Sequence, residues 1–157
     1  MRVFCFYDEY RKMKEETTVA KKFVIGLIGK PYSGKETVSK LLALKFGADV
    51  HHVMFSTPLT EFLVSMGHGR ESIDRPLLQK VAQNLNKHFG EGTVTRGALL
   101  LIKTSAARID IVDGVRWPSD FDGIKALADE HTVPLMIYVH ASEDKRFERG
   151  KKRTQRA

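Results

Sequence analysis

The residues whose types and spacing could do chemistry lie between Gly29 and Thr37. Two glycines separated by four residues are followed at once by a lysine, in the pattern G-x-x-x-x-G-K over residues 29–35. Glycines let the backbone adopt positive φ and approach a ligand closely, and a lysine ammonium is a compact charge that pairs with phosphate. Backbone N–H groups that converge from a loop and a helix N-terminus form an anion site. The pattern therefore predicts a phosphate-binding loop.

The segments on either side of this loop have the character that such a loop requires. Residues 23–28 form a short apolar run that predicts a strand buried on both faces. Residues 36–46 carry apolar side chains at helical spacing, and Gly47 is placed to end the helix. A strand leading in and a helix leading out are typical of the P-loop, or Walker A motif, of nucleotide-binding proteins. An ordinary strand-to-helix turn with a chance match is the alternative, and the flanks disfavour it.

The rest of the chain alternates expected strands with expected helices. Further strands are expected over residues 50–55, 109–112 and 134–139, and further helices over residues 57–66, 75–89, 95–105 and 119–130 and from Ser142 onward. Ser119 and Asp122 are expected to form a capping box at the start of the fourth of these helices. This alternation predicts an α/β fold in which helices cover both faces of a parallel sheet, a three-layer α/β/α arrangement.

Two further groups could act on phosphates. Asp113 follows an expected strand, so its carboxylate would lie at the carboxyl edge of the sheet, where such sheets bind ligands. There it could hold Mg²⁺ through water or orient an acceptor, although a turn-forming Asp-Gly pair explains the same residue equally well. Arg149, Arg153 and Arg156 recur at helical spacing. Arginines stabilise a phosphoryl group in transfer, and a solvated basic helix end is the alternative.

Composition narrows the class of protein. A chain of 157 residues with 42% hydrophobic and 29% charged residues fits one globular domain. Its one cysteine, Cys5, excludes an internal disulfide and favours a reducing, cytoplasmic setting, and no segment is apolar enough for a membrane span. Residues 143–157 hold seven basic and three acidic residues, so the net charge of +7 is concentrated at this end. The six histidines show no metal-ligand spacing.

The motif and its flanking segments resemble those of a known protein family. The segment from Gly29 through Pro31, Ser33, Gly34 and Lys35 to Thr37 is similar to the P-loop of adenylate kinases and related nucleoside monophosphate kinases. Further segments resemble dephospho-CoA kinase-like and phage-type deoxynucleotide kinase-like proteins, namely residues 55–59, 75–90, 112–116 and 140–153. The resemblance implies a P-loop NTPase fold of the nucleotide kinase type, with residues 1–21 as an N-terminal extension and residues 22–157 as the kinase-like domain ending in the lid region.

The resemblance also implies roles for individual residues. Those assigned to the ATP phosphates are Gly29, Ser33, Gly34, Lys35, Glu36 and Thr37. Lys35, Asp113, Arg149 and Arg153 are assigned to catalysis, the arginines as lid residues, and Arg156 is a further candidate for the lid. Arg75 and Arg116 are assigned to the acceptor phosphate, and Thr37 and Asp113 to Mg²⁺. Thr37 takes the metal role because Glu36 stands where the strict P-loop has Ser or Thr.

Departures from the family keep several functions open. Tyr32 stands where the family usually has glycine, residues 56–57 lack the acid that follows the second strand of dephospho-CoA kinases, and the chain stops at Ala157, before the family's last elements. The leading expectation is an ATP- and Mg²⁺-dependent kinase that phosphorylates a nucleoside or deoxynucleoside monophosphate. The alternatives are a dephospho-CoA kinase-like enzyme and a non-catalytic ATP-binding module. Nucleic-acid binding ranks last, no membrane partner is expected, and the oligomeric state stays open.

Overall fold

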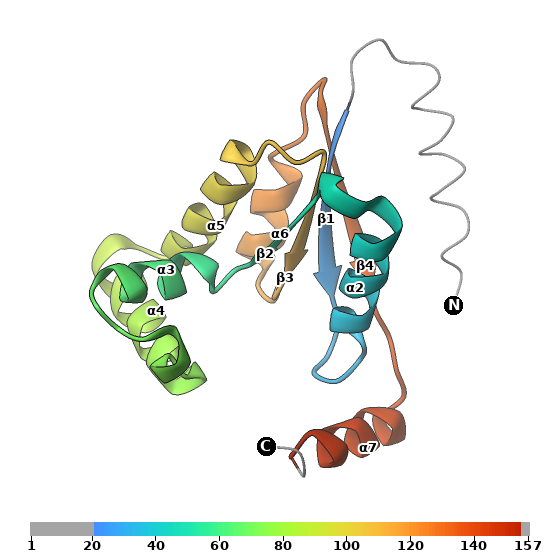
Figure 1. The fold of residues 1–157 in the computed structure, drawn as a ribbon. Coiled ribbons are helices and arrows are strands. Elements are labelled where there is room, and N and C mark those ends of the chain that lie inside the picture. Colours follow the sequence, from blue (N-terminus) through green and yellow to red (C-terminus); the bar gives the residue numbers. More distant parts are fainter. Residues whose placement is uncertain (1–20, 155–157) are drawn as a thin grey trace.

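Four parallel strands form the centre of the fold (Figure 1). The computed structural model describes residues 21–154, without the side chains of Arg153 and Thr154; nearly all of the expected N-terminal extension and the side chain of Arg156 therefore lie outside the described residues. The strands are β1 (Lys22–Ile28), β2 (Val50–Met54), β3 (Ile109–Asp113) and β4 (Thr132–Tyr138). They pair in the order β2-β3-β1-β4, and all pairs are parallel, which confirms the expected sheet.

Six helices connect or follow these strands. They are α2 (Lys35–Phe46), α3 (Thr57–Ser65), α4 (Arg75–Phe89), α5 (Thr93–Thr104), α6 (Pro118–Lys125) and α7 (Glu143–Thr154), with short 3-10 turns η1 (Gly47–Asp49) and η2 (Arg70–Ser72). Asp74 caps α4 by accepting a hydrogen bond from the Leu77 amide at 2.8 Å. No helix among residues 21–154 is long and apolar enough to cross a membrane.

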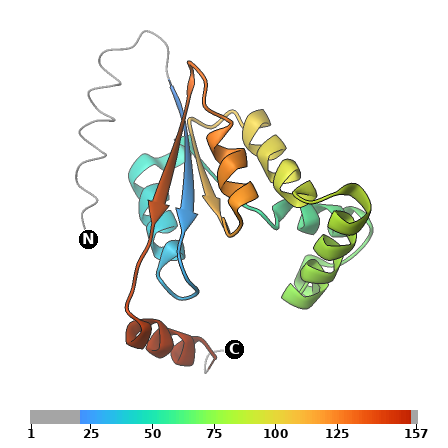
Figure 2. The same cartoon turned by 180° about the vertical axis from the view of Figure 1, so that it is seen from behind.

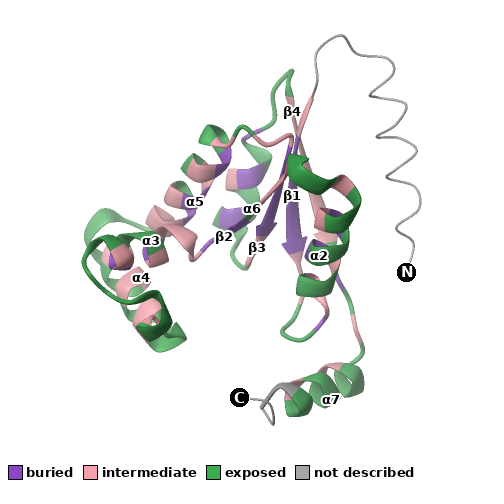
Figure 3. Ribbon diagram, viewed as in Figure 1, coloured by how far each residue is buried: buried purple, intermediate pink, exposed green. Residues whose placement is uncertain are grey.

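Helices cover both faces of the sheet and enclose two cores (Figures 2 and 3). In β1 the side chains of Phe23, Ile25 and Leu27 point to one face, where they pack with Leu42 of α2. Val24 points to the opposite face, where its cluster includes Ala98 and Ile102 of α5 and Ile124 of α6. The structure is therefore a three-layer α/β/α arrangement, as the sequence predicts.

The start and end of α6 differ from the expected helix. Pro118 occupies the first turn, and the cap is made by Asp120, whose Oδ2 accepts hydrogen bonds from the amides of Arg116 and Trp117 at 3.0 and 3.1 Å. The expected capping box of Ser119 and Asp122 is therefore wrong. Because Trp117 is the N-cap and Pro118 the first helical residue, the third helical position, where the acid of a capping box stands, is Asp120 and not Asp122.

The same helix ends at Lys125 because a tight turn precedes β4. The carboxylate of Asp129 accepts hydrogen bonds from the amides of His131 and Thr132 at 2.8 and 2.6 Å. These bonds, above all the one from His131, hold the pKa of Asp129 below its usual value. The turn uses the residues that the sequence assigned to the last part of the helix, which was expected to reach residue 130.

A buried charge cluster links the amino-terminal part of the sheet to α5. Asp110 of β3 is completely buried, and its Oδ2 lies 2.8 Å from Nζ of Lys22, an ion pair whose geometry is not that of a hydrogen bond. Nδ1 of His51 lies 2.8 Å from Oδ1 of the same carboxylate. Nζ of Lys22 also donates to the carbonyls of Ile102 and Ser105 at 2.6 and 2.7 Å. One ammonium therefore holds β1, β3 and the C-terminus of α5 together.

Replacing Lys22 with Met should destabilise the fold by about 3–5 kcal/mol, because it leaves a buried carboxylate without its cation. The measurement is the urea midpoint, followed by circular dichroism. The matched control is Lys40→Met, which removes an exposed ion pair of 2.9 Å with Glu36 and should change stability by less than about 1 kcal/mol. Equal midpoints for the two variants would contradict the structural role of Lys22.

Candidate functional site

Residues 29–34 form a tight loop that joins the end of β1 to the start of α2. The loop begins and ends with glycines at positive φ, 154° for Gly29 and 108° for Gly34. At Gly29 the space is also restricted, since a β-carbon there would collide with the carbonyl oxygen of Val139 and lie 2.8 Å from Oγ of Ser33. Glycine at position 29 is thus required by both the backbone conformation and the neighbouring chain.

Lys35 opens α2 and folds back over the loop. Its Nζ donates to the carbonyl of Gly29 at 2.8 Å and to that of Lys30 at 3.3 Å. The ammonium therefore lies against the loop, with neutral carbonyls as its partners. An anion bound by the loop would meet this charge directly, and a charge-assisted hydrogen bond is roughly twice as strong as a neutral one.

Two features beside Lys35 suit an anion as well. Gly34 precedes α2 and has no side chain to cap the free N–H groups of its first turn, so these groups can donate to a ligand. Ser33 is buried, and its Oγ makes no hydrogen bond within residues 21–154. A buried hydroxyl without a partner is unfavourable unless a ligand or water satisfies it. The sequence placed both Ser33 and Gly34 among the phosphate-binding residues, and the structure brings them together with Lys35.

Glu36 and Thr37 follow on the first turn of α2, where both side chains are exposed. Oε1 of Glu36 accepts a hydrogen bond from Nζ of Lys40 at 2.9 Å, one turn further along the helix. Its carboxylate is therefore directed along the outer side of α2. Thr37 is the first hydroxyl of this helix and remains the residue of α2 suited to a metal ion.

Asp113 lies beside the loop at the carboxyl edge of the sheet. It pairs in register with Leu27 of β1, two residues before the loop begins. Its Oδ1 accepts a hydrogen bond from the amide of Gly114 at 2.7 Å, and its carbonyl accepts one from Phe55 at 3.1 Å. Asp113 therefore has the position expected of a ligand-binding acid, and it also makes the turn that the alternative interpretation required.

Within residues 21–154 no group of three His, Cys, Asp or Glu side chains could hold a metal ion. Mg²⁺ usually keeps several waters and takes one or two protein oxygens together with substrate phosphates. Asp113 and Thr37 fit that kind of site and do not form a cage of protein ligands. Each could supply one oxygen to an ion of that kind.

Helix α7 lies beyond the carboxyl edge of the sheet, next to the loop (Figure 1). Nη1 of Arg149 donates to the carbonyls of Tyr32 and Ser33 at 3.1 and 3.0 Å and would lie 3.5 Å from a β-carbon on Gly34. Arg149 thus lies at the loop together with Lys35, and both are among the residues that the family resemblance assigns to catalysis. The side chain of Arg153, one turn further along α7, lies outside the described residues.

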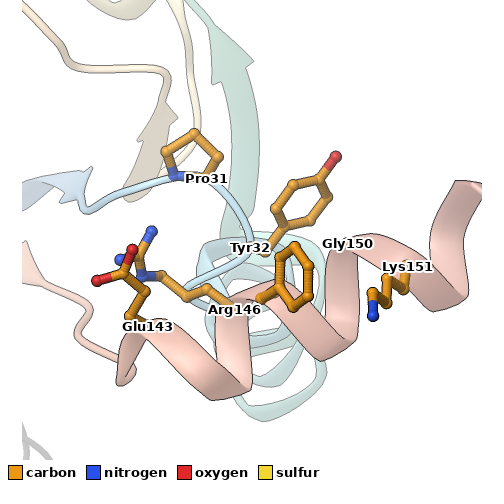
Figure 4. Close-up of a pocket in the computed structure, with 7 residues that line it drawn as sticks. Pro31, Tyr32, Glu143, Arg146, Gly150 and Lys151 are labelled. Carbon is orange, nitrogen blue, oxygen red and sulfur yellow. The ribbon is translucent and has the colours of Figure 1, made fainter.

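The loop and α7 enclose a groove of about 810 Å³ (Figure 4). It is lined by Pro31, Tyr32, Glu143, Arg146, Phe147, Gly150 and Lys151. A smaller cavity of about 230 Å³ lies between the loop and the connection from β4 to α7, and its lining includes Lys30, Ser33 and Arg146. The two openings place aromatic and basic side chains directly beside the loop.

The two arginines assigned to an acceptor lie apart from α7. Arg75 begins α4, which with α3 forms an arm to one side of the sheet (Figures 1 and 2). Arg116 follows β3 at the carboxyl edge. Both side chains are exposed, and within residues 21–154 neither makes a hydrogen bond or an ion pair. The structure leaves both arginines available to a ligand and does not bring them into contact with the loop.

Comparison with known proteins bears on the fold. No protein-family model and no curated protein matches the chain. Among solved structures, a chain of the Pnkp1/Rnl/Hen1 RNA repair complex is 16% identical with a TM-score of 0.55, covering 91% of this chain and 41% of that one. The crystal structure of APE1195 is 25% identical with a TM-score of 0.50, covering 89% of this chain and 72% of that one. This protein therefore spans about two fifths of the matching chain in the RNA repair complex, and that likeness concerns the fold alone.

Sequence reasoning missed the contact between the loop and the groove side of α7. The sequence marked Tyr32 only as a departure from glycine and marked Arg146 only as part of a basic run. The structure places both in the wall of the groove, together with Phe147. A bulky residue at a position that favours glycine was the available signal, because it implies that something nearby receives the side chain.

Replacing Gly29 with Ala should weaken ATP binding by about tenfold or more, since the loop must shift to admit a β-carbon and a strained backbone costs roughly 1–3 kcal/mol. The measurement is the Kd for ATP by calorimetry. Gly47→Ala is the matched control, because Gly47 also has positive φ, 65°, but has nothing within 4 Å of an added β-carbon. It should lower stability and leave the Kd unchanged. An unchanged Kd in the Gly29 variant would contradict the assignment of the loop.

Proposed function

We propose that this protein is an ATP- and Mg²⁺-dependent kinase that transfers the γ-phosphoryl group to a small phosphorylated acceptor, a nucleoside or deoxynucleoside monophosphate. The observation that carries the proposal is the loop between β1 and α2. It combines two left-handed glycines, a buried hydroxyl without a partner and an ammonium that lies against the loop carbonyls. Each of these features is ordinary alone, and together they suit a polyphosphate.

The chain's own residues would bind and orient the donor. The N-terminal amides of α2 and the amides of the loop would hold the phosphates, with Lys35 and Arg149 neutralising their charge. Both cations rest on neutral carbonyls, 2.8 Å and 3.0–3.1 Å away, so they can turn to an anion without breaking an ion pair. Bound Mg²⁺ would add a further positive charge on the phosphate oxygens.

Catalysis of this kind depends on position and charge more than on covalent chemistry. A phosphoryl group in transfer carries negative charge on its equatorial oxygens, and cations held around it lower the barrier. Lys35 reaches the loop from α2 and Arg149 reaches it from α7, so positive charge is available from two elements. Asp113, at the adjacent strand end, would bind Mg²⁺ or orient the phosphate of the acceptor, whose oxygen attacks the γ-phosphorus while ADP leaves.

The acceptor would lie between the loop and the arm that carries α4. Arg75 and Arg116 are exposed; Arg75 lies on the arm, which follows β2, and Arg116 follows β3, the strand next to β2. Guanidinium groups without an acidic partner are suited to bidentate recognition of a phosphate. The acceptor is therefore expected to carry a phosphate group of its own.

Replacing Lys35 with Ala should abolish phosphoryl transfer, by about 10³-fold or more, with little change in the melting temperature, since its partners are two loop carbonyls. The assay is ADP release from Mg-ATP with a panel of nucleoside and deoxynucleoside monophosphates, dephospho-CoA and an RNA oligonucleotide. RNA belongs in the panel because one similar chain comes from an RNA repair complex. Lys40→Ala, on the exposed side of the same helix, is the control and should keep full activity. Unchanged turnover in the Lys35 variant would refute the proposal.

A second candidate is a non-catalytic ATP-binding module. The observation in its favour is Asp113, whose Oδ1 is engaged by the neighbouring amide of Gly114. ATP binding without ADP release for every acceptor in the panel would favour this candidate over the kinase.

A further inference from the structure

Tyr32 holds a backbone conformation that side chains normally avoid. Its φ is 62°, and it is the one residue other than glycine with positive φ among residues 21–154. The left-handed region is disfavoured for residues with a β-carbon, and bulky side chains are rare there. Such a conformation persists when surrounding contacts fix it. The contacts of the Tyr32 ring therefore identify what stabilises this strained backbone conformation.

The ring of Tyr32 lies against α7 at a glycine. A β-carbon on Gly150 would lie 3.2 Å from Cε2 and 3.4 Å from Cδ2 of the ring. A helix interior normally favours residues other than glycine, and here the missing side chain lets the ring approach the helix backbone. Figure 4 shows the ring of Tyr32 beside the turn of α7 that carries Gly150.

Among the described residues, few other contacts hold α7. No residue from Glu143 to Lys152 is buried. Arg149 donates to the carbonyls of Tyr32 and Ser33, while Nε of Arg146 donates to Ala141 in the segment just before the helix. The position of α7 relative to the loop is therefore set largely by the ring of Tyr32 and the guanidinium of Arg149, both at the same turn of the helix.

We propose that Tyr32 is a positioning residue, whose ring holds α7 against the loop through Gly150 and thereby places Arg149 at the phosphate site. The inference rests on the proposed kinase function and names the device that orders its arginine-bearing helix. Without the ring, Arg149 would still reach the loop from a mobile helix, so donor binding would persist while the geometry needed for transfer would be populated less often.

The test uses three variants of Tyr32 in the full chain. Asn tolerates left-handed φ and removes the ring, Gly removes both the ring and the strain, and Phe keeps the ring and serves as the matched control. In the Asn and Gly variants, kcat for ADP release should fall roughly 10- to 100-fold because a displaced catalytic group is costly. The KM for ATP should change by less than about threefold. The melting temperature should not fall, and in the Gly variant it should rise.

Amide hydrogen exchange of the nucleotide-free protein supplies a readout that needs no activity. Exchange over residues 143–152 should become about tenfold faster in the Asn and Gly variants and stay unchanged in the Phe variant, with the strands unaffected. Gly150→Val should reproduce the effect from the helix side, because its side chain displaces the ring.

The outcomes separate this inference from the proposed function. Unchanged exchange over α7 in the Asn variant would overturn the inference even if the protein is a kinase. Faster exchange with unchanged kcat would overturn the positioning role while leaving the kinase intact. A large rise in the KM for ATP with α7 still protected would also overturn it, since the ring would then be contacting the nucleotide. If no acceptor supports turnover, the proposed function fails, and the exchange experiment still decides whether Tyr32 holds α7.

Discussion

Strand β1 has a paired strand on each edge and a layer of helices on each face, and this enclosure decides the rest of the structure. A strand in that position must be apolar on both sides, as the buried side chains of Phe23, Val24, Ile25 and Leu27 are. Its carboxyl end is consequently fixed in space. The next residues must leave the sheet between Asp113 of β3 and Val139 after β4, and the narrow space beside Val139 excludes a side chain at Gly29.

Because the end of β1 is fixed, the positive groups gather at one point. Three positive groups meet at the loop, namely the N-terminus of α2, the ammonium of Lys35 and the guanidinium of Arg149. Arg149 lies more than a hundred residues after the other two in the chain. The described side chains place no carboxylate in hydrogen-bonding contact with either cation, whose partners are loop carbonyls. Such a concentration of positive charge favours the binding of an anion.

The sequence predicted the elements whose signals are local. The apolar run of β1, the helical spacing of α2 and the parallel sheet are confirmed. The predicted start and end of α6 were wrong because Asp120 and Asp129 act through hydrogen bonds that apolar periodicity does not reveal. In the site, the position of Asp113 next to the loop follows from strand order and was predictable. The contact between Tyr32 and Gly150 joins residues 118 positions apart and depends on how α7 docks, which no local pattern specifies.

Lys22 lies at the amino end of β1, and Lys35 of α2 reaches the loop at its carboxyl end. Their hydrogen-bond and ion-pair partners distinguish a structural cation from one that can bind a ligand. Lys22 pairs with a fully buried carboxylate and two carbonyls, so moving it would strand a charge in the core. Lys35 has only carbonyl partners, one of them exposed, and exchanging these for phosphate oxygens replaces neutral acceptors with charged ones. The ammonium of Lys22 is therefore fixed by its partners at the amino end of the strand, whereas the ammonium of Lys35 at the carboxyl end can exchange its partners for a ligand. This difference follows from the burial of Asp110 at the amino end, where the ammonium has a carboxylate partner that the loop lacks among the described residues.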